Sequence, residues 1–198
     1  MKKENTHLII ISAPSGAGKT TLCRKLLRDF DPLFLSISST TRPPRGAEQN
    51  GVDYFFLTKK DFENQIRQNR FAEWALVHGN YYGTSKKVIS EATHDKKAVL
   101  LDIDVQGAEK LRLTYPHQCY RIFIAPPHLE VLEERLRARG TDTDEMIQKR
   151  LDHAKVEMAA GKSFDAHIVN DSLDRAYSEL QALVETQLAL YFKKNNNG

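Results

Sequence analysis

The chain has 198 residues, of which 40% are hydrophobic and 28% are charged, and its formal net charge at pH 7 is +3. This balance is typical of a soluble globular domain, and no apolar run approaches the roughly 18 residues of a membrane helix. The mild basic excess suits anionic ligands but falls short of the dense Lys/Arg stripe of a nucleic-acid-binding protein.

Hydrophobic patterning predicts alternating strands and helices. The expected strands lie at 8–11, 33–37, 98–104, 120–125 and 166–169. The expected helices lie at 20–30, 61–70, 129–139, from 142 or 143 onward, and at 173–192. The strands are short continuous apolar runs, typical of a sheet buried on both faces. Their alternation with helices predicts a parallel sheet with right-handed crossovers.

The alternation breaks between Ser38 and Lys87. This segment is rich in aromatic residues and carries turn pairs such as Pro43-Pro44 and Asn50-Gly51. We interpret it as an inserted subdomain with its own small sheet.

A phosphate-binding loop follows the first strand. The motif, which has alanine in place of glycine at its first position, is Ala13, Pro14, Ser15, Gly16, Ala17, Gly18, Lys19 and Thr20. The glycines let backbone amides point at phosphate oxygens, and the following helix adds its positive N-terminal end. Lys19 is expected to contact the β- and γ-phosphates, and Thr20 to bind Mg²⁺. A bound nucleoside triphosphate is predicted, but the motif alone does not separate a kinase from a GTPase, an ATPase motor or a nucleotide sensor.

A second cluster supplies groups for an acceptor. Arg42 and Arg45 lie among hydroxyl side chains and are separated by two prolines, which stiffen the backbone between them. Guanidinium groups bind phosphate bidentately, although this composition alone equally allows a solvated basic turn. Glu73 lies in an aromatic setting, and a carboxylate there would accept hydrogen bonds from the N1–H and N2–H₂ edge of guanine. Adenine lacks that adjacent donor pair.

Four segments, 38–45, 50–54, 79–83 and 101–107, resemble the guanylate kinase family, and the similarity runs from about residue 8 to about residue 190. The resemblance implies an α/β fold in one domain of about residues 6–190. Its expected parts are a P-loop NTPase-type three-layer core with a central parallel sheet (1–37, 88–128 and 156–198), a small inserted α+β GMP-binding subdomain (38–87) and a helical lid (129–155).

The resemblance also assigns roles to residues. It implies that the GMP phosphate is bound by Arg42, Arg45, Tyr54 and Tyr82. It implies that the guanine is read by Ser38, Glu73, Thr84 and Asp102, with Glu48 beside them. The resemblance further implies that Thr21 belongs to the ATP site and that Arg139 and Asn170 lie near the adenine. Lys19, Arg135 and Arg150 are the expected catalytic residues. Asp104 is a candidate for binding Mg²⁺ through water, and the sequence does not divide this role between Asp102 and Asp104.

The activity implied is Mg²⁺-dependent transfer of the ATP γ-phosphoryl group to GMP, within purine nucleotide metabolism. The expected partners are the two nucleotides, with no nucleic acid or membrane, and no pattern specifies or excludes a homo-oligomer. Cys23 and Cys119 form no disulfide framework, and with no signal-peptide pattern in view we expect a cytoplasmic protein. Two alternatives stay open: a non-catalytic guanylate-kinase-like scaffold, and a phosphate-loop kinase with another acceptor.

Overall fold

The computed structural model describes residues 6–77, 79–138, 140 and 142–196. In chain order its elements are β1 (Leu8–Ser12), α1 (Lys19–Asp29), β2 (Leu33–Ser36), β3 (Ser39–Thr40), β4 (Phe55–Phe56), α2 (Lys59–Arg67), β5 (Phe71–Val77), β6 (Asn80–Ser85), α3 (Lys86–His94), β7 (Ala98–Asp102), α4 (Val105–Thr114), β8 (Cys119–Ala125), α5 (Leu129–Ala138), α6 (Asp144–Gly161), β9 (Ala166–Val169) and α7 (Leu173–Asn196). No helix in these ranges combines the length and the apolar character that a membrane span requires.

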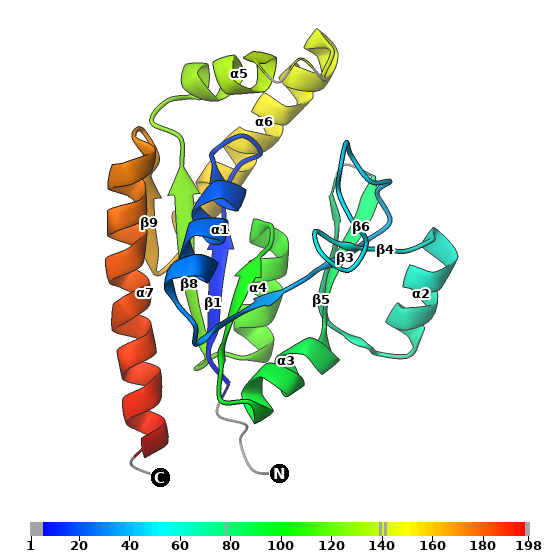
Figure 1. Ribbon diagram of the computed structural model, residues 1–198. Helices are drawn as coiled ribbons and strands as arrows, with labels where there is room; N and C mark the ends of the chain where they lie inside the picture. The colour runs from blue at the N-terminus through cyan, green and yellow to red at the C-terminus, as the bar shows by residue number, and fades with distance from the viewer. Residues whose placement is uncertain (1–5, 78, 139, 141, 197–198) are drawn as a thin grey trace.

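A five-stranded sheet forms the centre of the molecule (Figure 1). Its strand order is β2-β7-β1-β8-β9, and all neighbouring strands are parallel. The middle strand β1 is buried along its whole length because helices cover both faces. Ile9 and Ile11 join a cluster with α1 and α7, whereas Leu8 and Ile10 join one with α3 and α4. The three-layer core with a central parallel sheet is therefore confirmed.

The inserted segment folds around a second sheet of order β4-β3-β6-β5, which stands beside the central sheet in Figure 1. In it β6 is antiparallel to both β3 and β5. Phe62 of α2 fixes this unit from one side, since its ring stacks on Phe71 at 4.4 Å and on Tyr81 at 5.2 Å. The small sheet expected between residues 38 and 87 is present.

The helix α5 lies above one end of the central sheet, and α6 runs from α5 down to the core (Figure 1), where Gly161 lies against Phe123 of β8. The two helices pack through Leu132, Leu136, Ile147 and Leu151. The helix α6 runs unbroken through residues 155 and 156, where the boundary between lid and core was expected.

Two helices, α3 and α4, were not predicted, and the strand expected at 98–104 ends earlier, at Asp102. Asp104 is instead the N-cap of α4, and its carboxylate accepts hydrogen bonds from the backbone N–H of Gly107 at 3.0 Å and of Gln106 at 3.4 Å. An N-terminal cap of this kind ends the strand because it satisfies the first amides of a helix. The C-terminal helix is longer than expected and reaches Asn196.

Candidate active site

The phosphate-binding loop lies between the end of β1 and the start of α1. Gly16 and Gly18 have φ angles of 99° and 92°, a left-handed conformation that glycine adopts without steric cost. Gly18 is the N-cap of α1 and has no side chain to cap it, so the first amides of the helix are available to an anion. The local geometry is that of a phosphate socket.

Asn170 supports this loop from behind. Its side chain is 4% exposed, and its Nδ2 donates to the carbonyl oxygen of Ala17 at 2.7 Å. A Cβ at Gly18 would collide with that amide group, so glycine is required there for space as well. The family resemblance implies that Asn170 lies beside the adenine, whereas its side-chain amide in this structure contacts the loop backbone.

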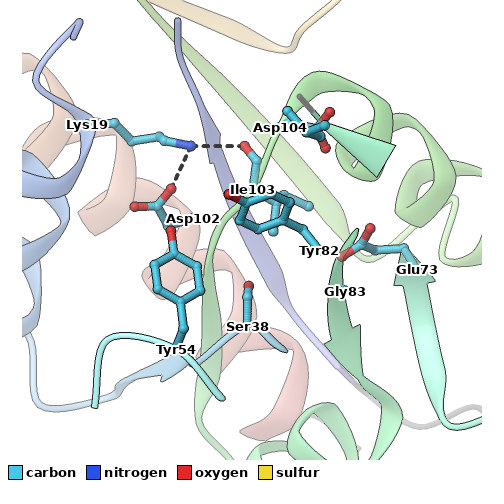
Figure 2. A pocket seen from close by; sticks show the side chains of 10 residues that line it. Lys19, Ser38, Tyr54, Glu73, Tyr82, Gly83, Asp102, Ile103 and Asp104 are labelled. Carbon is cyan, nitrogen blue, oxygen red and sulfur yellow. Dashed lines mark hydrogen bonds and ion pairs between the residues drawn. The ribbon is translucent and has the colours of Figure 1, made fainter. Parts of the chain in front are cut away.

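Lys19 is paired with a carboxylate from the neighbouring strand β7. Its Nζ lies 2.5 Å from Oδ1 of Asp102 and donates to the carbonyl oxygen of Ile103 at 3.2 Å (Figure 2). Burial alone would lower the pKa of Lys19, but the charge and hydrogen bond of Asp102 raise it above its usual value. The lysine is therefore a fixed cation at the mouth of the phosphate loop.

Arg42 is a buried cation, 6% exposed, in the segment after β3. Its guanidinium donates to Oε1 of Glu48 at 2.9 Å and to the carbonyl oxygen of Pro43 at 2.7 Å, and it lies 5.3 Å from the ring centre of Tyr54. Glu48 also accepts from the backbone N–H of Arg45 at 2.7 Å. Glu48, expected near the guanine, thus orients Arg42 and the Arg45 backbone.

Glu73 projects from β5 and is 5% exposed. Its Oε1 accepts a hydrogen bond from Thr84 Oγ1 at 2.7 Å. Burial raises the pKa of Glu73 to about 7; the Thr84 hydrogen bond acts against this shift, and the nearby charge of Asp104 adds to it. Thr84 is fully buried behind Glu73, so it holds the carboxylate in place.

Two cavities join these groups. The larger, of about 670 Å³, is lined by Ala13, Pro14, Ser15, Gly16, Gly18, Lys19, Thr20, Thr21, Arg42, Arg45, Glu48, Tyr54, Tyr82, Asp102, Asp104 and Arg150, among others. The smaller, of about 120 Å³, adds Ser38 and Glu73 and shares Lys19, Tyr54, Tyr82, Asp102 and Asp104 with the larger one (Figure 2). The phosphate-binding loop and the segment that carries Arg42 and Arg45, here called the arginine segment, therefore open onto one continuous space.

Of the arginines on α5 and α6 that were expected to act on the phosphates, Arg150 lines the larger cavity and Arg135 does not. Arg150 donates to Ser15 Oγ of the phosphate loop at 3.0 Å and to Oδ1 of Asp142 at 3.1 Å. Arg135 donates to the carbonyl oxygen of Asn170 at 3.0 Å. Arg139 lies outside the described residues.

Several lining residues were not singled out from the sequence. Among them, Met146 and Glu157 lie four residues before and seven residues after Arg150 on α6, and all three line the larger cavity. Burial raises the pKa of Glu157 to about 7. The helical spacing from Arg150 is the signal that could have revealed Glu157.

A parallel α/β core with a phosphate loop, a facing arginine segment and the packed helix pair α5 and α6 defines a P-loop kinase of the nucleoside-monophosphate class. The family model described as guanylate kinase matches residues 5–187. The guanylate kinase of Prochlorococcus marinus is 48% identical over 90% of this chain and 97% of its own length. That of Synechocystis sp. is 48% identical over 90% of this chain and 93% of its own.

A crystal structure of guanylate kinase from Anaplasma phagocytophilum superposes with a TM-score of 0.76 at 28% identity, covering 94% of this chain and 88% of that one. The chain belongs to the guanylate kinase family.

Proposed function

We propose that this protein transfers the γ-phosphoryl group of ATP to GMP, giving ADP and GDP, as a nucleoside-monophosphate kinase of purine metabolism. One observation carries the proposal: the phosphate loop and the buried Arg42 face the same 670 Å³ cavity, while Glu73 lies in the adjoining pocket. Two anionic substrates can therefore meet phosphate to phosphate.

On the donor side, the triphosphate would lie on the backbone amides of residues 13–20. Lys19 is the charge that follows the β- and γ-phosphates, and ATP binding would require it to exchange Asp102 for phosphate oxygens. The adenine would lie toward Arg139 and Asn170.

On the acceptor side, Arg42, Arg45, Tyr54 and Tyr82 would bind the GMP phosphate. Arg42 is prepared for this role because Glu48 and the Pro43 carbonyl fix its guanidinium before any ligand arrives. Glu73, with Ser38, Thr84 and Asp102 around it, would accept hydrogen bonds from the guanine edge, which requires its ionised form.

The reaction needs no general base. The attacking atom is a GMP phosphate oxygen that is already anionic near neutral pH, so catalysis depends on alignment and charge neutralisation. Arg150 already touches Ser15 of the phosphate loop and would stabilise charge on the transferring group. Arg135 would reach that group only after leaving the Asn170 carbonyl, a movement expected of a lid.

The oxygen ligands present fit Mg²⁺. Thr20, Asp102 and Asp104 line the same cavity, and within the described residues no group of three or more His, Cys, Asp or Glu side chains forms a metal cage. Mg²⁺ commonly binds through one or two carboxylates with water and substrate phosphates, so Thr20 would bind it directly and Asp104 through water. Bound there, Mg²⁺ would neutralise charge on the phosphate oxygens.

We further propose that residues 38–87 act as the GMP-binding subdomain and residues 129–155 as the lid over the core. Because ATP and GMP are cytoplasmic metabolites, we expect the protein to act in the cytoplasm.

A coupled assay of ADP release tests the function with GMP, AMP, dTMP and a ribosyl bisphosphate as acceptors. GMP is expected to give the highest kcat/KM, with activity lost on chelation of Mg²⁺. A clear preference for another acceptor would refute the assignment, and binding of both nucleotides without turnover would indicate a scaffold.

A further inference from the structure

The first turn of α4 approaches Glu73 unusually closely. A Cβ built on Gly107 would lie 2.7 Å from Oε2 and 3.1 Å from Cδ of Glu73, and 3.2 Å from Oδ1 of Asp104. Gly107 therefore stands between two carboxylates that come from different parts of the fold. The space that a methyl group would fill is occupied by the end of the Glu73 side chain.

The other contacts of Glu73 fix the present orientation of its carboxylate and the place of the strand that carries it. Its Oε1 is held by Thr84, and its side chain is almost completely buried. The strand that carries it is tied to α4 as well, because Nζ of Lys110 donates to the carbonyl oxygen of Trp74 and lies 4.8 Å from the Trp74 ring centre. If a side chain appeared at position 107, the strand could not simply move back, and the carboxylate would have to turn.

We propose that Gly107 is a specificity-determining position: the missing side chain leaves room for the Glu73 carboxylate to take the orientation that reads guanine. This inference rests on the proposed function, in which Glu73 accepts hydrogen bonds from the base. Gly107 itself would touch neither substrate, so it acts as a positioning residue. The core helix α4 thereby sets the selectivity of a pocket whose base-reading group belongs to the inserted subdomain.

The same geometry predicts that the fold tolerates Gly107→Ala. The colliding atom is the far end of a flexible side chain rather than backbone, and alanine is favoured over glycine within a helix. The substitution should leave the melting temperature close to that of the wild type while it displaces the carboxylate. The Gly107→Ala protein should therefore be folded and impaired only in its recognition of guanine.

The experiment compares wild type, Gly107→Ala and the control Gln106→Ala, an exposed neighbour in the same turn. Because a charge-assisted hydrogen bond is at stake, Gly107→Ala should raise the KM for GMP roughly tenfold while the KM for ATP changes less than about twofold. IMP lacks the 2-amino group, so the preference for GMP over IMP should shrink as well. Gln106→Ala should behave as wild type.

A double-mutant cycle with Glu73→Asp separates positioning from damage to the fold. The shorter aspartate does not reach position 107, so Gly107→Ala should cost less than about twofold in that background. An equal cost in both backgrounds, an unchanged GMP preference in Gly107→Ala, or a Gly107→Ala chain that does not fold would each overturn the inference. A wild-type enzyme that does not prefer GMP would overturn the proposed function itself and this inference with it.

Discussion

The carboxylate of Asp142 holds the guanidinium of Arg150 at 3.1 Å, and both side chains are largely buried, at 4% and 13% exposure. The other arm of the same guanidinium reaches Ser15 of the phosphate loop. Asp142 therefore fixes the direction of an arginine of α6 that lines the cavity.

Replacing Asp142 by alanine should lower kcat roughly tenfold with little change in either KM, since Asp142 orients Arg150, which we propose acts on the transferring phosphoryl group. Steady-state kinetics with both substrates varied would measure it. The conservative variant Asp142→Glu should recover part of the rate, and Asp152→Ala, at an exposed aspartate on α6, is the control. A rise in KM alone would place Asp142 outside this role.

Lys19→Ala should reduce kcat by at least about a hundredfold, because the lysine is the cation expected at the terminal phosphates. The protein should remain folded, as judged by circular dichroism, since Lys19 lies at the start of α1 rather than in the core. The exposed Lys60 offers a matched Lys60→Ala control. Near-normal turnover of the Lys19 variant would contradict its assignment to the phosphates.

Arg42→Ala should raise the KM for GMP by about 10- to 100-fold and that for ATP by less than about twofold, because the variant loses the charge-assisted phosphate contact that we propose for this buried arginine. Glu48→Gln should have a smaller effect in the same direction, since it loosens Arg42 without removing it. Arg67→Ala, on α2, serves as the control. Equal effects on the two substrates would move Arg42 to a different site.

The raised pKa of Glu73 predicts that the difference in stability between wild type and Glu73→Gln depends on pH. Its pKa of about 7 in the folded protein lies above its usual value of 4.5, so the carboxyl is protonated in both the folded and the unfolded state below about pH 4.5. Between pH 4.5 and 7 the unfolded state releases this proton while the folded state keeps it, so the free energy of unfolding falls across that window. The loss in free energy of unfolding is at most about 3 kcal/mol, and Glu73→Gln should remove it.

Urea unfolding of wild type and Glu73→Gln at pH 5 and pH 8 measures that difference. The variant should gain free energy of unfolding relative to wild type at pH 8 and much less at pH 5, while its KM for GMP rises. A gain of equal size at both pH values would contradict the raised pKa of Glu73.

Asn170→Ala distinguishes support of the phosphate loop from contact with the adenine. Because Nδ2 of Asn170 donates to the Ala17 carbonyl, the variant should weaken binding of ATP and of inorganic triphosphate by a similar factor in calorimetry. A loss confined to ATP would instead assign Asn170 to the base.

Local patterns predicted the core well. The strand at 166–169 and the phosphate loop are specified by short runs of sequence, as is the helix that Thr143 caps by accepting from the N–H of Met146. The helix α4 was missed because its apolar residues are few and interrupted by Gly107, so its amphipathic pattern is weak. Its cap, Asp104, was interpreted as the end of a strand.

The finer part of the site depends on contacts between segments far apart in the chain. Gly107 lies against Glu73, and Asn170 against Ala17, only because the fold brings these segments together. No periodicity within one segment carries such information. The motifs therefore predicted which residue types would meet the ligands, whereas the partners that hold those side chains became visible only in the tertiary structure.

The unbroken course of α6 bears on how the proposed lid would move. The helix ends at Gly161, whose Cα faces the ring of Phe123 so closely that a Cβ there would lie 2.6 Å from it. From Gly161 to Arg150 the helix forms a stiff lever roughly 16 Å long, at about 1.5 Å per residue. A rotation of about 10° at the Phe123 contact would then swing Arg150 by about 3 Å, comparable to the length of one hydrogen bond.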